Sequence, residues 1–141
     1  MRGTWEDLNR RLTGAILALD LHDSLVIGER QEKPRKKLFG AAPPPTAGPH
    51  RYVQVTAARN VLIAECAGST RIGGALEMSE ETEARLLKQG WQKPYLPEMT
   101  TFQREAPLAG APRLALATVR ALQAMGCEME ELEVTLTREE P

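Results

Sequence analysis

The sequence predicts an α+β fold in which an antiparallel sheet of about five strands is packed by helices. Apolar residues recur at helical spacing near both ends of the chain and in its middle. Between these segments lie short stretches with the β-branched or alternating character of strands, several joined by connections too short for a crossover. The predicted order is α-β-β-β-α-β-β-α, with an extra strand at the C-terminal end.

The first helix is predicted to begin after Thr4, which can cap it, and to end near Asp20. Asp7 complements the positive end of this helix. Residues 25–27 are apolar and β-branched, and they predict a first strand that ends near Gly28. The apolar stripe of the helix consists of Leu8, Leu12, Ala15, Ile16 and Leu19.

A basic, proline-rich segment follows the first strand. Residues 30–37 hold five basic side chains, and four prolines lie between positions 43 and 49. Proline removes backbone donors and favours extended polyproline geometry. We interpret residues 31–50 as a disordered loop inside a single domain spanning residues 1–141, because the first strand alone cannot form a domain.

Two further strands are predicted at residues 52–56 and 61–67. The first alternates polar and apolar residues, which indicates that one face is buried. The second is almost continuously apolar, which is typical of a central strand. Residues 57–60 are few enough to form a hairpin connection between them.

The second helix is predicted to begin after Ser79, a suitable N-cap, and to end at Gly90, which suits a left-handed C-terminal cap. Trp91 is expected to begin a strand that Pro94 interrupts, and to pack against this helix. Residues 100–105 then form the next strand.

The third helix is predicted to begin at Pro112 and to end at Gly126. Arg113 and Arg120 are its only charged residues; they lie seven positions apart on one face, with Leu116 near that face. The helix is apolar almost all round, so one side is expected to cover the sheet and another to meet a partner.

The last segment alternates between apolar and polar residues. Leu132, Val134 and Leu136 are separated by a glutamate and a threonine. This pattern predicts an edge strand with one face in water.

Composition excludes several classes of function. The net charge of −1 provides no general attraction to nucleic acid or to an anionic membrane. No segment approaches the ~20 apolar residues of a membrane span, and the charged N-terminus does not resemble a signal peptide. Cys66 and Cys127 lack metal or disulfide spacing and are interpreted as buried free thiols. We expect a soluble, cytoplasmic protein.

Two motifs invite a chemical interpretation. His22-Asp23-Ser24 resembles a triad by composition, but catalytic partners converge from separate segments, so a polar turn is favoured. The glycine-rich stretch 68–74 could bind a small anion, yet it lacks the lysine of a phosphate loop. We therefore expect no catalytic, cofactor-binding or metal-binding residues and no enzymatic activity.

One stretch, residues 76–105, carries a resemblance to a known family. Its Ser79-Glu80-Glu81, Gly90-Trp91 and Phe102 resemble the TY-Chap domains of actinobacteria, which are related to YbjN and to type III secretion chaperones. The likeness is clearest over residues 51–125. It implies a non-catalytic, dimer-capable, protein-binding fold, although the long basic loop and the acidic, strand-like C-terminal end depart from the family pattern.

The main hypothesis is therefore a chaperone-like or regulatory adaptor module that binds another protein, with a homodimer enlarging the binding surface. The candidate contact residues are Tyr95, Leu116, Arg113 and Arg120. The alternatives are a small-anion-binding protein and a nucleic-acid-associated regulator that uses the basic loop. For that loop we favour a solvated segment, because it offers little aromatic surface for base stacking. Its candidate residues are Arg35, Lys36 and Lys37.

Overall fold

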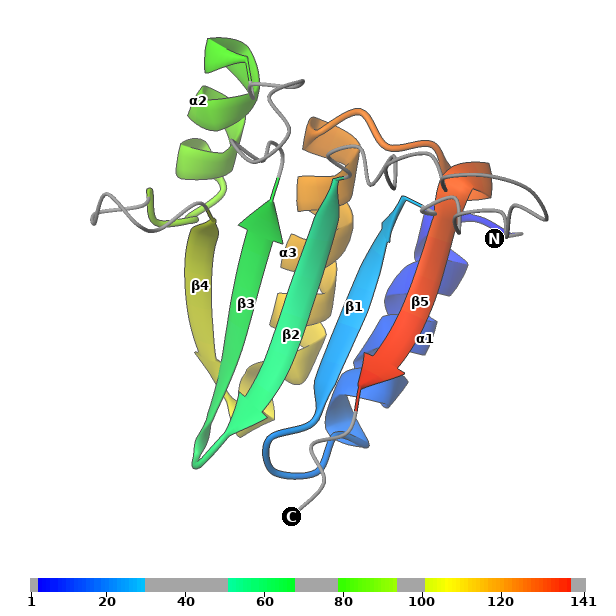
Figure 1. Cartoon of the computed structure of the whole chain (residues 1–141), viewed down its shortest axis with the longest axis vertical. Coiled ribbons are helices and arrows are strands. Elements are labelled where there is room, and N and C mark those ends of the chain that lie inside the picture. The colour runs from blue at the N-terminus through cyan, green and yellow to red at the C-terminus, as the bar shows by residue number, and fades with distance from the viewer. Residues whose placement is uncertain (1–2, 30–50, 68–78, 94–100, 138–141) are drawn as a thin grey trace, which may run out of the picture.

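The computed structural model describes residues 3–29, 51–67, 79–93 and 101–137, which form a sheet backed by helices (Figure 1). Five antiparallel strands run in the order β4-β3-β2-β1-β5. The strands are β1 (Ser24–Glu29), β2 (Tyr52–Ala58), β3 (Val61–Ala67), β4 (Phe102–Pro107) and β5 (Leu132–Thr137). The helices are α1 (Trp5–Leu17), α2 (Glu80–Lys88) and α3 (Ala111–Ala124), with short 3-10 turns η1 (Leu108–Gly110) and η2 (Met129–Glu131).

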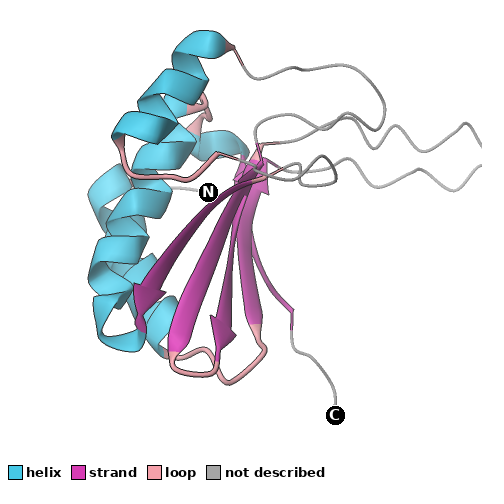
Figure 2. Cartoon of the chain, turned by 90° about the vertical axis from the view of Figure 1, so that its left-hand side faces the viewer, coloured by secondary structure: helices cyan, strands magenta, loops and turns pink. Residues whose placement is uncertain are grey.

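The three helices all lie on one face of the sheet (Figure 2). The described part of the chain leaves the opposite face uncovered. The predicted α+β class, the element order and the C-terminal strand are therefore confirmed. The predicted loop at 31–50 lies outside the described residues.

A capping box begins α1, as the sequence predicts in part. The amide of Asp7 donates to Oγ1 of Thr4 over 3.1 Å, and the amide of Thr4 donates back to Oδ2 of Asp7 over 3.2 Å. The bond from the Thr4 amide, together with the Thr4 side chain, favours the charged carboxylate and lowers the pKa of Asp7. The helix ends at Leu17, earlier than predicted, because the chain turns at Asp20, whose amide donates to Asp23.

Gly28 lies inside β1 rather than at its end, and it faces Tyr52 of β2 in the strand register. A Cβ at this position would lie 2.5 Å from Cβ of Tyr52 and 2.6 Å from the carbonyl oxygen of Arg51. Glycine therefore allows a close approach between the two strands that a larger residue would prevent.

The β2–β3 hairpin is tighter than predicted. β2 continues through Ala58, so that only Arg59 and Asn60 form the turn. Asn60 adopts a φ of 67°, a conformation that asparagine tolerates better than most residues.

The segment after α2 forms only a single bridge instead of the predicted strand. Gly90 has a φ of 101°, and the amide of Trp91 donates to the carbonyl of Leu86 over 3.0 Å, which ends the helix and buries the indole. Gln92 then pairs with Gln103 of β4, and no strand continues among the described residues.

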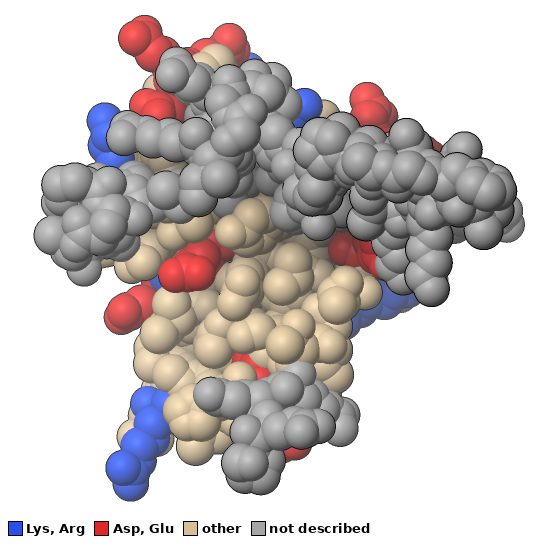
Figure 3. Space-filling view, in the orientation of Figure 1, with Lys and Arg blue, Asp and Glu red and all other residues tan. Residues whose placement is uncertain are grey.

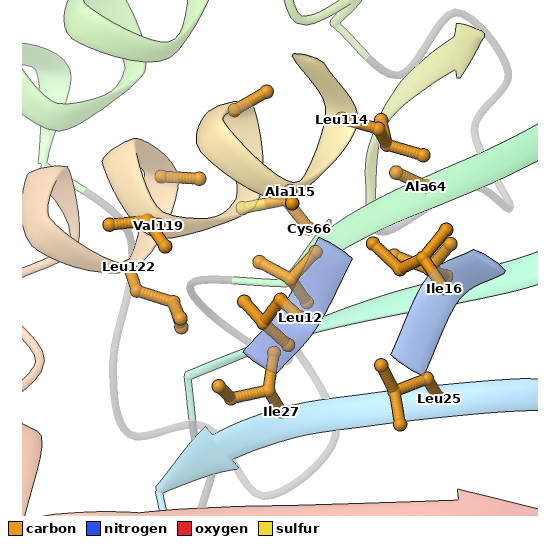
Figure 4. Close-up of a cluster of buried hydrophobic side chains, with 14 of the residues drawn as sticks. Leu12, Ile16, Leu25, Ile27, Ala64, Cys66, Leu114, Ala115, Val119 and Leu122 are labelled. Atoms are coloured by element: carbon orange, nitrogen blue, oxygen red, sulfur yellow. The ribbon is translucent and has the colours of Figure 1, made fainter. Parts of the chain in front are cut away.

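The core lies between the sheet and the pair α1 and α3. Leu12 and Ile16 of α1 point toward Leu25 and Ile27 of β1 (Figure 4). Thr118 is the buried polar side chain of α3, and its hydroxyl donates to the carbonyl of Leu114 over 2.9 Å. The burial of these aliphatic side chains is the main source of stability.

The edge strand β5 is more exposed to solvent than predicted. Leu132 is buried, but Val134 and Leu136 remain 37% and 47% exposed although they face the same side as the core. The helical layer therefore does not cover the far end of this strand, and two apolar side chains meet solvent there.

Candidate functional site

The outer face of α3 presents the residues that the sequence predicts for partner contact. Arg113, Leu116 and Arg120 are all exposed, while Leu114, Ala115, Ala117, Thr118 and Val119 between them are buried. Leu116 is 38% exposed, which is high for a leucine on a helix that packs against a sheet. The helix therefore has a buried face toward the core and an exposed face that carries one apolar and two cationic side chains.

A cleft of about 480 Å³ opens where β4 meets the start of α3. This volume falls in the range of binding sites for small ligands or short peptide segments. The lining residues come from β4, η1 and the first turn of α3: Arg104, Glu105, Ala106, Pro107, Ala109, Gly110, Pro112, Arg113 and Leu114. Arg113 therefore belongs to both the outer face of α3 and the cleft.

Arg104 is the main residue that the sequence analysis missed. Its side chain projects to the helix side of the sheet, as do Phe102 and Ala106, because alternate residues of a strand share a face. Nη1 of Arg104 donates a hydrogen bond to the carbonyl oxygen of Gln89, the C-cap of α2. The sequence does contain one sign of this role: Arg104 is a charged residue at a strand position whose neighbours two residues away face the core.

Glu105 contributes less negative charge to the cleft than its place in the lining suggests. It follows Arg104 in the strand and pairs with Ile63, so its side chain projects to the opposite face of the sheet. The other charged residues among the described lining residues are Arg104 and Arg113.

The outer edge of β4 beside this cleft retains hydrogen-bonding capacity. Gln103 exchanges two backbone bonds with Gln92, of 2.8 Å and 3.0 Å. In an antiparallel strand the residue two positions on directs its backbone groups to the same side. The amide and carbonyl of Glu105 consequently point outward, and no described residue pairs with them there.

The open face of the sheet, defined by Ser24, Val26, Gln54, Thr56 and Ile63, is mostly uncharged in its middle (Figure 3). Hydroxyls of Ser24 and Thr56 lie 2.9 Å apart and hydrogen-bond each other across the β1–β2 pair. These two hydroxyls therefore satisfy one another.

Several other predicted features give no site. Tyr95, the basic loop residues Arg35, Lys36 and Lys37, and the stretch 68–74 lie outside the described residues. His22 occupies a turn with a φ of 70°, and Asp23 accepts the amide of Asp20, as expected for a polar turn. Among the residues that the structure describes, no three His, Cys, Asp or Glu side chains gather closely enough to hold a metal. Within those same ranges, no helix is long and apolar enough to cross a membrane.

Both cysteines are buried and unlinked, as predicted. Burial raises the pKa of each thiol to about 12, and Cys66 Sγ lies 3.4 Å from Sδ of Met125. Nucleophilic chemistry requires the thiolate, which these surroundings disfavour. Neither cysteine therefore resembles a catalytic nucleophile.

A helix-backed sheet with a concave, cation-lined edge defines a small α+β binding module. The family model TY-Chap3, described as "T3SS (YopN, CesT) and YbjN peptide-binding chaperone 3", matches residues 1–133, and the chain belongs to this family. No curated protein and no solved structure gives a significant match. The resemblance inferred from residues 76–105 is thus confirmed at the level of the family.

Proposed function

We propose that the protein is a non-catalytic, chaperone-like module that holds an extended segment of a partner protein between β4 and the outer face of α3. The observation that carries this proposal is the cleft beside the outer edge of β4, where no described residue pairs with the backbone of Glu105. Membership of a family described as peptide-binding chaperones supports the same function.

An extended segment suits this site for two physical reasons. The outward amide and carbonyl of Glu105 can pair with the backbone of an added strand, which gives affinity without sequence preference. The exposed side chains of Pro107, which lines the cleft, and of Leu116, on the outer face of α3, can contact apolar side chains of that segment. The chain would therefore recognise unfolded or extended segments rather than a folded surface.

A cytoplasmic location accords with the state of the thiols. Cys66 and Cys127 are unpaired and buried, as is usual for proteins in a reducing compartment. We propose this location together with the chaperone-like role.

The test of the proposed function is peptide binding mapped by NMR. A 15N-labelled sample is titrated with short synthetic peptides, and amide shifts are expected to change along β4 and the first half of α3. Leu116→Ala should weaken binding several-fold, roughly the effect of removing one apolar contact. Leu17→Ala, at a leucine that is 62% exposed on α1, is the matched control and should leave affinity unchanged. Shifts confined to the open face would contradict the proposal.

We further propose that two copies associate through β5 to enlarge the binding surface. β5 pairs with β1 alone among the described strands, which leaves its outer edge unpaired. Val134 and Leu136 expose apolar surface on the same strand. Two antiparallel β5 strands related by a two-fold axis would bring Val134 of one copy close to Leu136 of the other.

Light scattering coupled to size-exclusion chromatography tests this association. Leu136→Lys introduces a charge at the edge and should convert a dimer to a monomer, because edge lysines oppose strand pairing. Leu87→Lys, on an exposed leucine of α2, is the control. A monomer in the unmodified protein would remove the dimer and leave peptide binding as a separate question.

A further inference from the structure

We infer that the cleft selects partner segments that carry an Asp or Glu side chain, with Arg104 and Arg113 as the residues that read the carboxylate. This inference rests on the proposed peptide-binding function and specifies the class of segment. It goes further than the family description, which specifies no sequence preference.

The two arginines reach one cleft from different elements, Arg104 from β4 and Arg113 from the first turn of α3. By contrast, Arg10 pairs with Asp7 and Arg85 with Glu81 on helix surfaces. No described carboxylate pairs with either arginine of the cleft. Both arginines thus line the same cleft without an ion-pair partner among the described residues.

A second arginine, Arg51, also donates to the C-cap carbonyl of a helix, and unlike Arg104 it has a carboxylate partner. Arg51 donates to the carbonyl of Met125, the C-cap of α3, just as Arg104 donates to the C-cap of α2. The Nε of Arg51 also lies 3.3 Å from Oε1 of Glu29, so its charge is balanced within the sheet. Arg104 lacks such a partner among the residues described. An external carboxylate would complete the same arrangement there.

Arg104 is also held ready for that role. Its bond to the α2 cap fixes one nitrogen and leaves the other guanidinium donors available, since arginine carries five N–H groups. A partly buried guanidinium whose position is already fixed loses little entropy on binding and forms stronger charge-assisted bonds than a surface lysine. Arg113 is exposed and can adjust to the second carboxylate oxygen.

The walls of the cleft distinguish a peptide carboxylate from other anions. Ala106, Pro107, Pro112 and Leu114 are apolar, and none of the lining residues that the structure describes is aromatic. A nucleotide would find no stacking platform there. An acidic residue flanked by apolar residues would instead match both the charge and the apolar surface.

The experiment uses the full chain and an arrayed library of short peptides with randomised sequence, acetylated at the N-terminus and amidated at the C-terminus. Carboxylates then come from side chains alone. Bound peptides are expected to be enriched in Asp or Glu next to apolar residues. The best peptide and its Glu→Gln counterpart are then compared by fluorescence anisotropy, and the amide form should bind about tenfold more weakly.

The protein variants identify which arginines read the carboxylate. Arg113→Gln should weaken binding of the acidic peptide about tenfold but that of the amide peptide by less than about twofold, because the two losses share one interaction. Arg104→Gln should behave likewise, with circular dichroism and thermal unfolding confirming that it is folded. Arg11→Gln removes the same charge from an exposed position on α1 and should have no effect.

The outcomes separate this inference from the proposed function. Peptide binding without acidic enrichment, or acidic preference that survives in either Arg104→Gln or Arg113→Gln, overturns the inference and leaves the peptide-binding function intact. Absence of binding to every peptide overturns the proposed function itself. Acidic enrichment that is lost in both of these variants and retained in Arg11→Gln establishes the inference.

Discussion

The two ends of the sheet differ in how the helices cover them. Toward the β1–β5 end, Leu12 and Ile16 of α1 pack directly onto Leu25 and Ile27 of β1, and the far end of β5 stays partly exposed. At the β4 end, a cleft of about 480 Å³ whose lining includes two arginines opens beside the packed core. We therefore expect substitutions over β1 to change mainly stability and substitutions at the cleft to change mainly binding.

This separation has a physical reason. A fully packed layer leaves no room for a ligand, whereas a site needs concave surface and unsatisfied groups that cost stability. A rigid closed end can hold the open end in position, so that a partner segment meets a preformed edge. Substitutions at the two ends should accordingly affect different measurements.

The largest effect is expected for Leu12→Ala at the closed end. Leu12 is 2% exposed, and removal of its side chain leaves a cavity, so the free energy of unfolding should fall by about 2–5 kcal/mol in urea titrations. Leu116→Ala removes the same atoms from the surface and should change the stability by less than about 0.5 kcal/mol. Equal losses in the two variants would remove the distinction between the ends.

Gly28→Ala tests how tightly the strands are packed near the closed end. The added Cβ would lie 2.5 Å from Cβ of Tyr52, so one strand must shift, and we expect a loss of about 1–3 kcal/mol in the free energy of unfolding. Gly14→Ala is the matched control. Apart from its chain neighbours and the backbone of its own helix, no described atom would lie within 4 Å of the added Cβ, and alanine in a helix should stabilise by about 0.5–1 kcal/mol. Differential scanning calorimetry measures both; an unchanged Gly28 variant would show that the sheet adjusts freely.

Thr4→Ala tests whether α1 depends on its cap as well as on its packing. The substitution removes the hydroxyl that accepts the amide of Asp7 and should lower the free energy of unfolding by about 1 kcal/mol in chemical denaturation. Thr4→Ser retains the hydroxyl and should restore most of the loss. A Ser variant as unstable as the Ala variant would argue against the capping explanation.

The smallest effect concerns acid stability at the same cap. The pKa of Asp7 is lower in the folded state, chiefly because of hydrogen bonds from Thr4, so its contribution is present above the unfolded pKa of about 4. That contribution is lost as the pH falls through the lower folded pKa. Asp7→Asn should therefore be less stable than the unmodified protein at neutral pH, and thermal unfolding should show the gap closing in acid. A stability difference between the two proteins that grows as the pH falls would contradict the predicted direction.

Local patterns predicted most of the fold. Thr4, Ser79, Gly90 and Gly126 mark helix ends through backbone preferences that operate over a few residues. The observed strand ends differ from the predicted ones where pairing with a distant strand sets them. Among the described residues, the segment after α2 forms a single bridge between Gln92 and Gln103, and Trp91 beside it is buried.

The site was predictable only in part. Helical spacing alone places Arg113, Leu116 and Arg120 on one face, and that face is exposed. Arg104 lay in an ordinary strand pattern, and nothing local shows that its guanidinium caps α2 fifteen positions away in sequence. Such a contact depends on how β4 and α2 are placed by the rest of the chain.

The amino-acid sequence by itself determined the elements, their order and the amphipathic face of α3, because caps, periodicity and turn residues act locally. Only the tertiary structure decided which end of the sheet is filled and which remains open. That outcome depends on the positions of α1 and α3 across the strands, and these positions are set by the packing of side chains distant in sequence. Arg104 and Arg113 become one candidate site through that packing.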